Sequence, residues 1–332
     1  MKDLDVVGIG NALVDVMSHV RDETLSELGI TKGIMHLIDL ERATMFHDLL
    51  KDRTEVSGGS AANTIAGIAM LGGRAGYIGK VCDDQLGSVF SAGLAQLGIA
   101  FKTPALSVES GIESGRSMVL ISPNGERTMN TYLGAAEFLS PSDIDSDMIA
   151  GARWIYLEGY RFDGPDSVEA FRKAVKLCHD SGGRVALTLS DPFCVNRNRH
   201  AFRELISGGI ELLVCNRDEL ISMYGAGDLS GALDLAAAEV PLVACTASEQ
   251  GAIIAEGKSR IQIAAFPAKI VDATGAGDLF AAGLLHGLVA GRDLESAGMM
   301  GCAAAAEIIS HLGARPQMDL RKHFTDLGLQ AC

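Results

Sequence analysis

The chain has 332 residues, with 28 Lys and Arg against 42 Asp and Glu, and its formal net charge is −14. This acidic balance argues against a general affinity for nucleic acid or for anionic membranes. Apolar residues make up 48% and charged residues 21%, which excludes a disordered or collagen-like chain. No apolar run reaches the roughly 18–20 residues of a membrane span. The first residues of the chain are acidic and do not resemble a secretory signal. The seven cysteines are scattered, without a Cys-x-x-Cys pair. We therefore expect a cytoplasmic protein with reduced thiols and no nucleic-acid or membrane partner.

Short apolar runs alternate with helical patterns along the chain. Apolar residues at steps of three and four, closed by Gly98, predict a helix over 86–97. The alternation predicts a single α/β domain over 1–332, with a mostly parallel central sheet and helices on both faces. The expected strands are 4–9, 75–79, 153–158, 184–190, 210–214 and 241–246, and the expected helices are 61–71, 86–97, 166–180, 200–207, 217–224 and 231–239.

Two segments depart from this alternation of strands and helices. Residues 12–50 hold short strand-like pieces, and residues 116–132 predict a hairpin whose turn contains Asn124 and Gly125. We expect both segments to form one small β-sheet, a lid appended to the main domain.

Two familiar nucleotide motifs are incomplete. Gly8 and Gly10 begin a dinucleotide fingerprint whose third glycine is missing, so a nicotinamide oxidoreductase is a weak alternative. Gly79 and Lys80 resemble a phosphate-binding loop, but Arg74 and Val81 occupy positions that the motif reserves for other residues.

The most informative segment is 271–285, in which small residues open an apolar helix. The first N–H groups of a helix lack intrahelical partners and lie at its positive end, so the amides of Gly275, Ala276 and Gly277 suit a phosphate. Asp278 lies in the first turn, where its carboxylate could accept a proton from an attacking hydroxyl. Alternatively, Asp278 only complements the helix dipole.

A second glycine-rich element lies upstream, where Gly58 and Gly59 precede a helix that contains Asn63. The glycines permit close approach of a polyol to the backbone, and the amide of Asn63 supplies a donor and an acceptor. Taken alone, this pattern is also typical of a tight turn with a helix cap.

Together the two elements resemble the signature regions of the ribokinase-like (PfkB) family of carbohydrate and nucleoside kinases, over nearly the whole chain. Asn216 and Glu219 are similar to the Asn-x-x-Glu of that family. The resemblance implies a three-layer α/β sandwich with a β-sheet lid. It also implies transfer of the γ-phosphoryl group of ATP to a primary hydroxyl, with Mg²⁺.

The resemblance assigns roles to particular positions. It implies that Asp278 is the general base and that the amides of Gly275, Ala276 and Gly277 stabilise the transferred group. The residues expected to bind the acceptor are Asn11, Asp15, Gly59, Asn63, Arg127 and Tyr160. Those expected to bind ATP are Asn216, Glu219, Thr246, Gly251 and Thr274, with Glu219 holding Mg²⁺ through water. A monovalent cation near 272–274, and a monomer or a homodimer, remain open.

Residues 10–15, 189–193 and 301–304 are most similar to adenosine kinases, which implies a nucleoside acceptor and the 5′-hydroxyl of adenosine in particular. The alternative acceptor is a sugar: ribose, fructose or 2-keto-3-deoxygluconate. Leu13, Tyr160 and Phe193 favour a nucleoside, whereas Arg161 would suit the carboxylate of a sugar acid. A non-catalytic nucleoside sensor is a further alternative.

Overall fold

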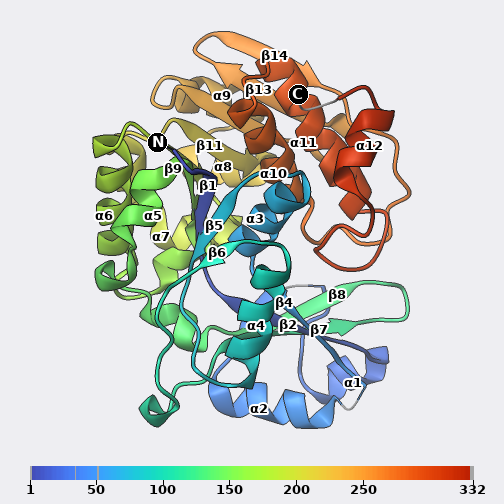
Figure 1. Ribbon diagram of the computed structural model, residues 1–332. Coiled ribbons are helices and arrows are strands. Elements are labelled where there is room, and N and C mark those ends of the chain that lie inside the picture. Colours follow the sequence, from blue (N-terminus) through green and yellow to red (C-terminus); the bar gives the residue numbers. More distant parts are fainter. Residues whose placement is uncertain (1, 34, 51, 330–332) are drawn as a thin grey trace.

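A nine-stranded sheet forms the centre of the larger part of the molecule (Figure 1). The computed structural model describes residues 2–33, 35–50 and 52–329. The strand order is β14-β13-β12-β11-β10-β9-β1-β5-β6, parallel from β12 to β6 and antiparallel at β13 and β14. The bounds are β1 Leu4–Ile9, β5 Ala75–Ile78, β6 Ala100–Phe101, β9 Ala152–Glu158, β10 Arg184–Thr188, β11 Leu212–Asn216, β12 Leu242–Thr246, β13 Ala252–Glu256 and β14 Ser259–Ile263.

Helices cover both faces of this sheet, so its continuously apolar strands are buried on both sides. One face carries α3 (Ser60–Met70), α4 (Gln85–Gln96), α10 (Ala276–Val289), α11 (Leu294–Ile308) and α12 (Leu320–Asp326). The other carries α5 (Ser146–Gly151), α6 (Ser167–Asp180), α7 (Pro192–Ser207), α8 (Arg217–Tyr224) and α9 (Leu229–Ala237). The three layers are those that the alternating pattern predicts.

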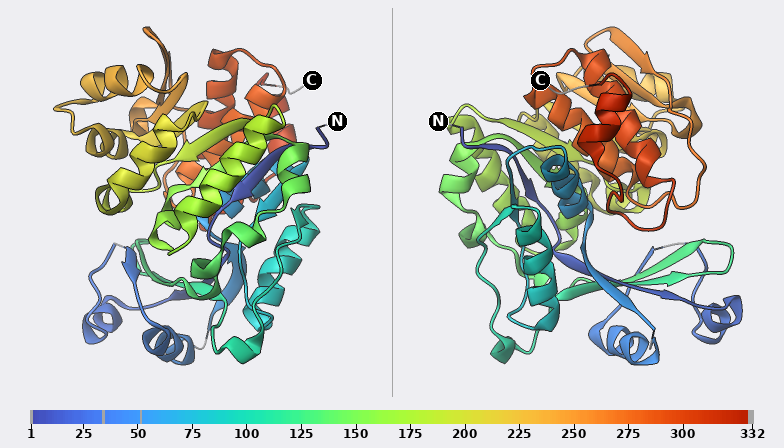
Figure 2. Two further views of the ribbon diagram at one scale, coloured as in Figure 1. Left: turned by 90° about the vertical axis from the view of Figure 1, so that its left-hand side faces the viewer. Right: turned by 45° about the vertical axis from the view of Figure 1, so that its right-hand side comes forward.

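A second, five-stranded sheet lies against one end of the larger part (Figure 2). We call it the lid sheet; its order is β3-β8-β7-β2-β4. Its strands are β2 Leu13–His19, β3 Met35–Leu37, β4 Thr54–Gly58, β7 Gly115–Ile121 and β8 Arg127–Tyr132, and α1 (Asp22–Glu27) and α2 (Leu40–Leu49) accompany it. The expected segments 12–50 and 116–132 leave out β4, which pairs with β2. Residues 12–50 also contain α1 and α2, which the strand-like pieces do not predict.

The predicted elements do not include β13, β14, α11 or α12, and the helix predicted within α7 is too short. We expect a helix over 200–207, but α7 begins at Pro192 because Asp191 caps it and accepts a hydrogen bond from Cys194 N. Asn198 interrupts it with non-helical angles, which obscures the first half of the helix in the sequence pattern. The strand expected over 210–214 lies two residues later.

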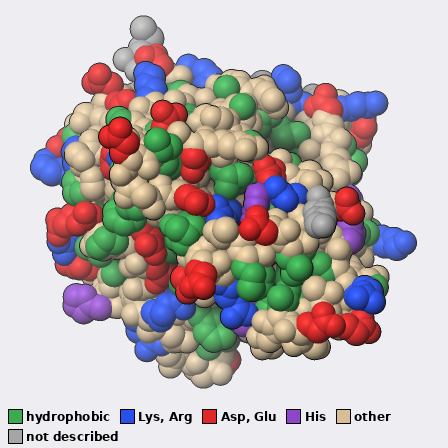
Figure 3. Space-filling model, turned by 90° about the horizontal axis from the view of Figure 1, so that it is seen from below, with side chains coloured by type: hydrophobic (Ala, Val, Ile, Leu, Met, Phe, Trp, Pro, Cys, Tyr) green, Lys and Arg blue, Asp and Glu red, His purple; other side chains and the backbone are tan. Residues whose placement is uncertain are grey.

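Six cysteines lie in the described part of the chain, and all are buried and unpaired; Cys332 falls outside the described residues. Among the described helices, none has the length and apolar character needed to cross a membrane. Seen from below, from the side of the lid sheet, acidic side chains are interspersed with Lys and Arg (Figure 3).

Candidate active site

Two adjoining cavities lie where the parallel strands of the large sheet end. The lid-side cavity, of about 710 Å³, is also lined by residues of the lid sheet. The C-terminal cavity, of about 770 Å³, is lined in part by residues of β12 and α11 and by the segment that follows β14. The two share one wall: Ser60, Ser190, Asn216, Glu219, Ala273, Ala276, Gly277 and Asp278.

The start of α10 forms the centre of this wall. Gly275 caps the helix with a φ of 80°, a left-handed conformation that favours glycine. A Cβ added to Gly277 would meet nothing within 4 Å, because this position faces open space in both cavities. The first turn of α10 and its positive end therefore lie beside both cavities, where an anion would be favoured; Ala276 N itself donates to Ala273 O at 3.3 Å.

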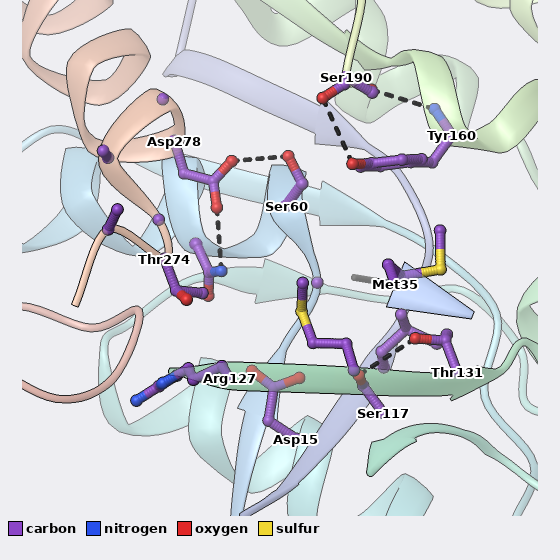
Figure 4. Close-up of a pocket in the computed structure, with 18 of the residues that line it drawn as sticks. Asp15, Met35, Ser60, Ser117, Arg127, Thr131, Tyr160, Ser190, Thr274 and Asp278 are labelled. Atoms are coloured by element: carbon purple, nitrogen blue, oxygen red, sulfur yellow. Dashed lines mark hydrogen bonds between the residues drawn. The ribbon is translucent and has the colours of Figure 1, made fainter. Parts of the chain in front are cut away.

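Asp278 lies on the same wall and is held by α3 (Figure 4). Ser60 Oγ donates to Oδ1 at 2.6 Å, and Asn63 Nδ2 donates to Oδ2 at 3.1 Å. Burial raises the pKa of Asp278 to about 6, although these two hydrogen bonds and the charge of Arg315 oppose the shift. A carboxylate with this pKa suits a general base that works near neutral pH.

The glycine pair before α3 brings a second carboxylate close. Gly59 has a φ of 94°, and a Cβ there would lie 2.4 Å from the carbonyl oxygen of Asn11. A Cβ on Gly58 would lie 2.4 Å from the carboxylate of Asp15, which β2 supplies. Gly58 is therefore required by the close approach of β2 to β4, and Gly59 by the close approach of the segment between β1 and β2.

Asp15 and Asp278 line the lid-side cavity from opposite sides (Figure 4). Burial raises the pKa of Asp15 to about 6, and the negative charge of Asp278 adds to the shift. The charges of Arg315 and Arg127 act in the opposite direction. The cavity therefore holds two carboxylates whose ionisation depends on nearby cations.

Glu158, at the end of β9, is a third carboxylate of the lid-side cavity. It accepts hydrogen bonds from Asn11 N at 3.2 Å and Ala61 N at 2.8 Å. Burial is the main cause that raises its pKa to about 7. A Cβ on Gly10 would lie 2.3 Å from its carboxylate, which explains the glycine there.

An ion pair connects the lid sheet to the segment that precedes α10. Arg127 Nη2, from β8, lies 2.8 Å from Asp272 Oδ2, and both side chains are buried. Asp272 also accepts hydrogen bonds from Thr274 N and Gly313 N, each at 3.0 Å. The guanidinium that was expected to bind the acceptor is therefore paired with a carboxylate here.

Apolar side chains line one side of the lid-side cavity and form what we call the apolar slot: Leu13, Met35, Met129, Leu133 and Tyr160. Tyr160 is fixed by Ser190, since its OH donates to Ser190 O at 3.3 Å and its N donates to Ser190 Oγ at 3.1 Å. In Figure 4, Met35 and Tyr160 lie on the same side of the cavity, away from Arg127.

Two residues that sequence reasoning placed near the acceptor lie elsewhere. Arg161 is buried and donates to the carbonyl oxygens of Ala136 and Leu139, to Ser167 Oγ and to Asn11 Oδ1. It holds the chain together behind the cavity and offers no free cation to a sugar acid. Phe193 is 72% exposed and lines neither cavity, because it lies at the outer start of α7.

The C-terminal cavity contains the Asn-x-x-Glu pair. Asn216 and Glu219 form a reciprocal cap at the start of α8: Asn216 N donates to Glu219 Oε2 at 2.9 Å, and Glu219 N donates to Asn216 Oδ1 at 2.9 Å. Burial raises the pKa of Glu219 to about 7. Within the described residues no cluster of three or more His, Cys, Asp or Glu could hold a metal ion. Two oxygen-bearing side chains on a cavity wall fit a hydrated Mg²⁺ that arrives with a phosphate ligand.

The residues that the sequence assigned to catalysis, to the acceptor and to ATP all line one or both cavities. Thr246 and Gly251 line the C-terminal cavity, whereas Thr274, expected at ATP, lines the lid-side cavity. Sequence reasoning missed Ser60, Glu158, Asp272 and Arg315. A glutamate that ends an otherwise apolar strand was a usable signal for Glu158, but no pattern marks Arg315.

Comparison with known proteins places this site in a family. The family model for pfkB family carbohydrate kinases matches residues 28–321. The structure of an adenosine kinase from Sinorhizobium meliloti is 42% identical, with a TM-score of 0.91 over 98% of this chain and 99% of that one. A protein from Rhizobium etli CFN 42, described as a probable sugar kinase, is 41% identical, with a TM-score of 0.93 over 99% and 100% of the two chains. The 5-dehydro-2-deoxygluconokinase of Shouchella clausii is 26% identical over 93% of this chain and 90% of its own.

These findings confirm the expected ribokinase-like fold and the kinase class, while the names of the relatives divide between nucleoside and sugar acceptors. Members of this family are phosphotransferases with alcohol acceptors that use ATP and Mg²⁺. The chain belongs to the pfkB family of carbohydrate kinases.

Proposed function

We propose that the protein transfers the γ-phosphoryl group of ATP to the 5′-hydroxyl of a nucleoside, with adenosine as the first candidate. The observation that carries this proposal is the apolar slot, which lines the same cavity as Asp278. A purine base presents two flat apolar faces, and side chains such as Met129 and Tyr160 suit them. A simple sugar presents only a small apolar C–H face to the slot.

In the proposed reaction the acceptor hydroxyl lies beside Asp278 and the ATP phosphates lie at the start of α10. Asp278 takes the hydroxyl proton while the oxygen bonds to the γ-phosphorus, and the bond from that phosphorus to the β-phosphate oxygen breaks, so ADP leaves. The amides of Gly275, Ala276 and Gly277 hold the charge on the transferred group. Such transfers depend on positioning and electrostatic stabilisation.

The ribose hydroxyls would lie against Asp15, Gly59 and Asn63, with Asn11 adjacent. Asn63 Oδ1 is buried without a hydrogen-bond partner in the described structure, so it is available to a hydroxyl donor. Asn216 and Glu219 would hold the water shell of Mg²⁺, which neutralises phosphate charge when bound. Thr246 and Gly251 would contact the nucleotide in the C-terminal cavity.

A sugar acid is a poor match for the same cavity. Asp15, Glu158 and Asp163 all line it, so a carboxylated acceptor would meet like charge. Its natural counter-ions are also engaged, because Arg161 is bonded to backbone carbonyls and Arg127 to Asp272. Adenosine is further supported by the name of the 42% identical Sinorhizobium meliloti protein. The name of the Rhizobium etli protein favours a sugar, which makes neutral sugars the second candidate.

A coupled ADP-release assay tests the acceptor, with adenosine, inosine, guanosine, cytidine, ribose, fructose and 2-keto-3-deoxygluconate. We expect the highest kcat/KM with adenosine. Replacing Met129 by Ser in the apolar slot should raise KM for nucleosides and leave any activity on ribose unchanged. A sugar as the best acceptor would overturn the proposal, and binding of adenosine without any ADP release would instead indicate a sensor.

A further inference from the structure

A pair of hydroxyl groups lies beside the apolar slot of the lid-side cavity. Ser117 of β7 and Thr131 of β8 are partners in the register of the lid sheet, and both line the cavity. Their side-chain oxygens are 3.1 Å apart and form a hydrogen bond in which either oxygen can be the donor (Figure 4). Both residues are buried, with 4% and 6% of their surfaces exposed. We call these two residues the hydroxyl pair.

The hydroxyl pair has one more hydrogen-bond donor than the protein uses. Two hydroxyls supply two O–H donors, and the bond between them uses only one. Neither oxygen has another hydrogen-bond partner among the described residues. A ligand that displaces water from the cavity must accept the second O–H or leave a buried donor unpaired, which is costly.

The register of the lid sheet places the hydroxyl pair next to Asp15. Asp15 of β2 is paired with Ser117, Ser117 with Thr131, and Thr131 with Leu37 of β3. These four residues form a row across the lid sheet, and all of them line the cavity. Neighbouring strands are about 4.8 Å apart, so the row extends about 10 Å from Asp15 to Thr131. A ligand that lies along this row with its polyol end at Asp15 brings its other end over the hydroxyl pair.

We propose that the hydroxyl pair recognises the purine base of the acceptor by donating a hydrogen bond to one of its ring nitrogens. The inference rests on the proposed nucleoside kinase activity and names the group that distinguishes one base from another. Adenine has acceptor nitrogens at N1, N3 and N7, and a hydroxyl donor suits each of them. Met35 and Met129 of the apolar slot contribute apolar surface to the same cavity, and low local polarity strengthens such a bond. The apolar slot suits any flat ring, whereas the hydroxyl pair selects a ring by the position of an acceptor atom.

Adenosine analogues in which C–H replaces a single ring nitrogen test this proposal. The analogues are 1-deazaadenosine, 3-deazaadenosine and 7-deazaadenosine, and each lacks one acceptor while it keeps the shape of adenosine. The measured quantity is the ratio of kcat/KM for adenosine to kcat/KM for the analogue. In the wild type we expect this ratio to be roughly 10 to 100 for one of the three analogues, because a buried donor is left unpaired. Three ratios within about twofold of one, too small for a lost hydrogen bond, would overturn the proposal.

The double variant Ser117→Ala with Thr131→Val assigns the lost bond to the hydroxyl pair. Both hydroxyls are removed because either oxygen can be the donor, and Val keeps the branched shape of Thr. The large ratio should fall to within about twofold of one in this variant. A purely structural role would lower kcat/KM for adenosine and for the analogue together, so an unchanged ratio would contradict the inference. If the double variant does not fold, the two single variants are measured, and wild-type ratios in both would contradict it equally.

Thr128→Val is the matched control. Thr128 is also a buried threonine of β8, but it lines neither cavity, and its hydroxyl accepts a hydrogen bond from Gly33 N at 3.0 Å. We expect the wild-type ratios to persist in this variant, whatever its stability, because both substrates meet the same enzyme. A control that loses discrimination as fully as the double variant would overturn the assignment to the hydroxyl pair.

Binding measurements separate this inference from the proposed function. Adenosine and the three analogues are titrated calorimetrically into the wild type without ATP, and we expect the same analogue to bind roughly 10- to 100-fold more weakly. Equal binding and equal turnover of all four nucleosides would remove the role of the hydroxyl pair and leave the kinase activity in place. Discrimination in binding without any ADP release would remove the proposed function and support the recognition. Adenosine that neither binds nor reacts would remove both.

Discussion

At the scale of single residues, Asp278 is the proposed general base, and its carboxylate is held by Ser60 and Asn63. Replacing it by Asn keeps the shape and one hydrogen-bond acceptor for Ser60 or Asn63. Loss of a general base should reduce kcat by roughly 10²–10⁴, or about 3–5 kcal/mol, with ATP affinity by calorimetry unchanged. Asp234→Asn, on an exposed side chain, is the matched control. Near wild-type turnover in Asp278→Asn would exclude Asp278 as the base.

The pH dependence of turnover follows from the same residue. Because the pKa of Asp278 is about 6, its carboxylate becomes protonated as the pH falls through 6, and the base is lost. We expect kcat/KM to be level above about pH 7 and to fall tenfold per pH unit well below 6. A profile that stays level to pH 5 would contradict this prediction.

Burial of the Asp15 carboxylate lowers the free energy of unfolding at neutral pH, and replacement of Asp15 should reveal this effect. Its pKa is about 6 in the folded protein and about 4 in an unfolded chain. Between these values the folded state binds more protons, so the free energy of unfolding falls as the pH rises from 4 to 6 and stays low above 6. Asp15→Asn should therefore have a higher Tm than the wild type at pH 8 and an equal Tm near pH 4. A lower Tm at pH 8 would show that the charge is stabilising.

Candidate site residues could be predicted from the sequence where their position depends on the local backbone, such as a glycine turn. Gly58, Gly59 and Gly275 lie where another part of the chain approaches closely, and Asp278 lies three residues after Gly275. Arg315 could not be located in this way, because its hydrogen-bond partner Ser57 is 258 residues away in the chain. Arg161 was misjudged for the same reason: its carbonyl partners are 22 and 25 residues upstream.

At the scale of elements, β8 is tied to the main domain by the pair of Arg127 and Asp272. Breaking this pair on one side leaves an uncompensated buried charge, which typically costs about 3–5 kcal/mol. Arg127→Met should therefore lower the Tm and speed amide exchange in β7 and β8. Arg127→Met combined with Asp272→Asn should recover much of the Tm while β7 and β8 still exchange faster than in the wild type. Unchanged exchange in both variants would show that this pair does not hold the lid sheet.

Helices and strands were predicted well where apolar residues repeat along one buried face of the element. α8 was expected over 217–224 and lies there, and the hairpin of β7 and β8 was recognised from its turn. β4 was missed because Thr54–Gly58 carries a single large apolar residue, and its place is set by pairing with β2. Long-range pairing of this kind leaves no periodic signal.

At the scale of the whole molecule, the site depends on how closely α10 packs against α11. A Cβ on Gly283 would lie 2.4 Å from Met300 O, so backbone rather than a flexible side chain limits the space. Gly287 meets Ala297 in the same interface, where the added Cβ would be 2.8 Å from its Cα. Glycines in the middle of α10 therefore set the distance between the two helices, and α10 begins at the turn proposed to hold the transferred phosphoryl group.

Gly283→Ala should consequently affect both stability and turnover. Overpacking typically costs about 1–3 kcal/mol, which lowers the Tm by a few degrees. The displaced α10 should also lower kcat, because Asp278 moves away from Ser60 and Asn63. Gly227→Ala, where an added Cβ would meet nothing within 4 Å, should change neither quantity. Wild-type Tm and kcat in Gly283→Ala would mean that the helices separate without cost, and that the close packing of α10 on α11 does not position Asp278.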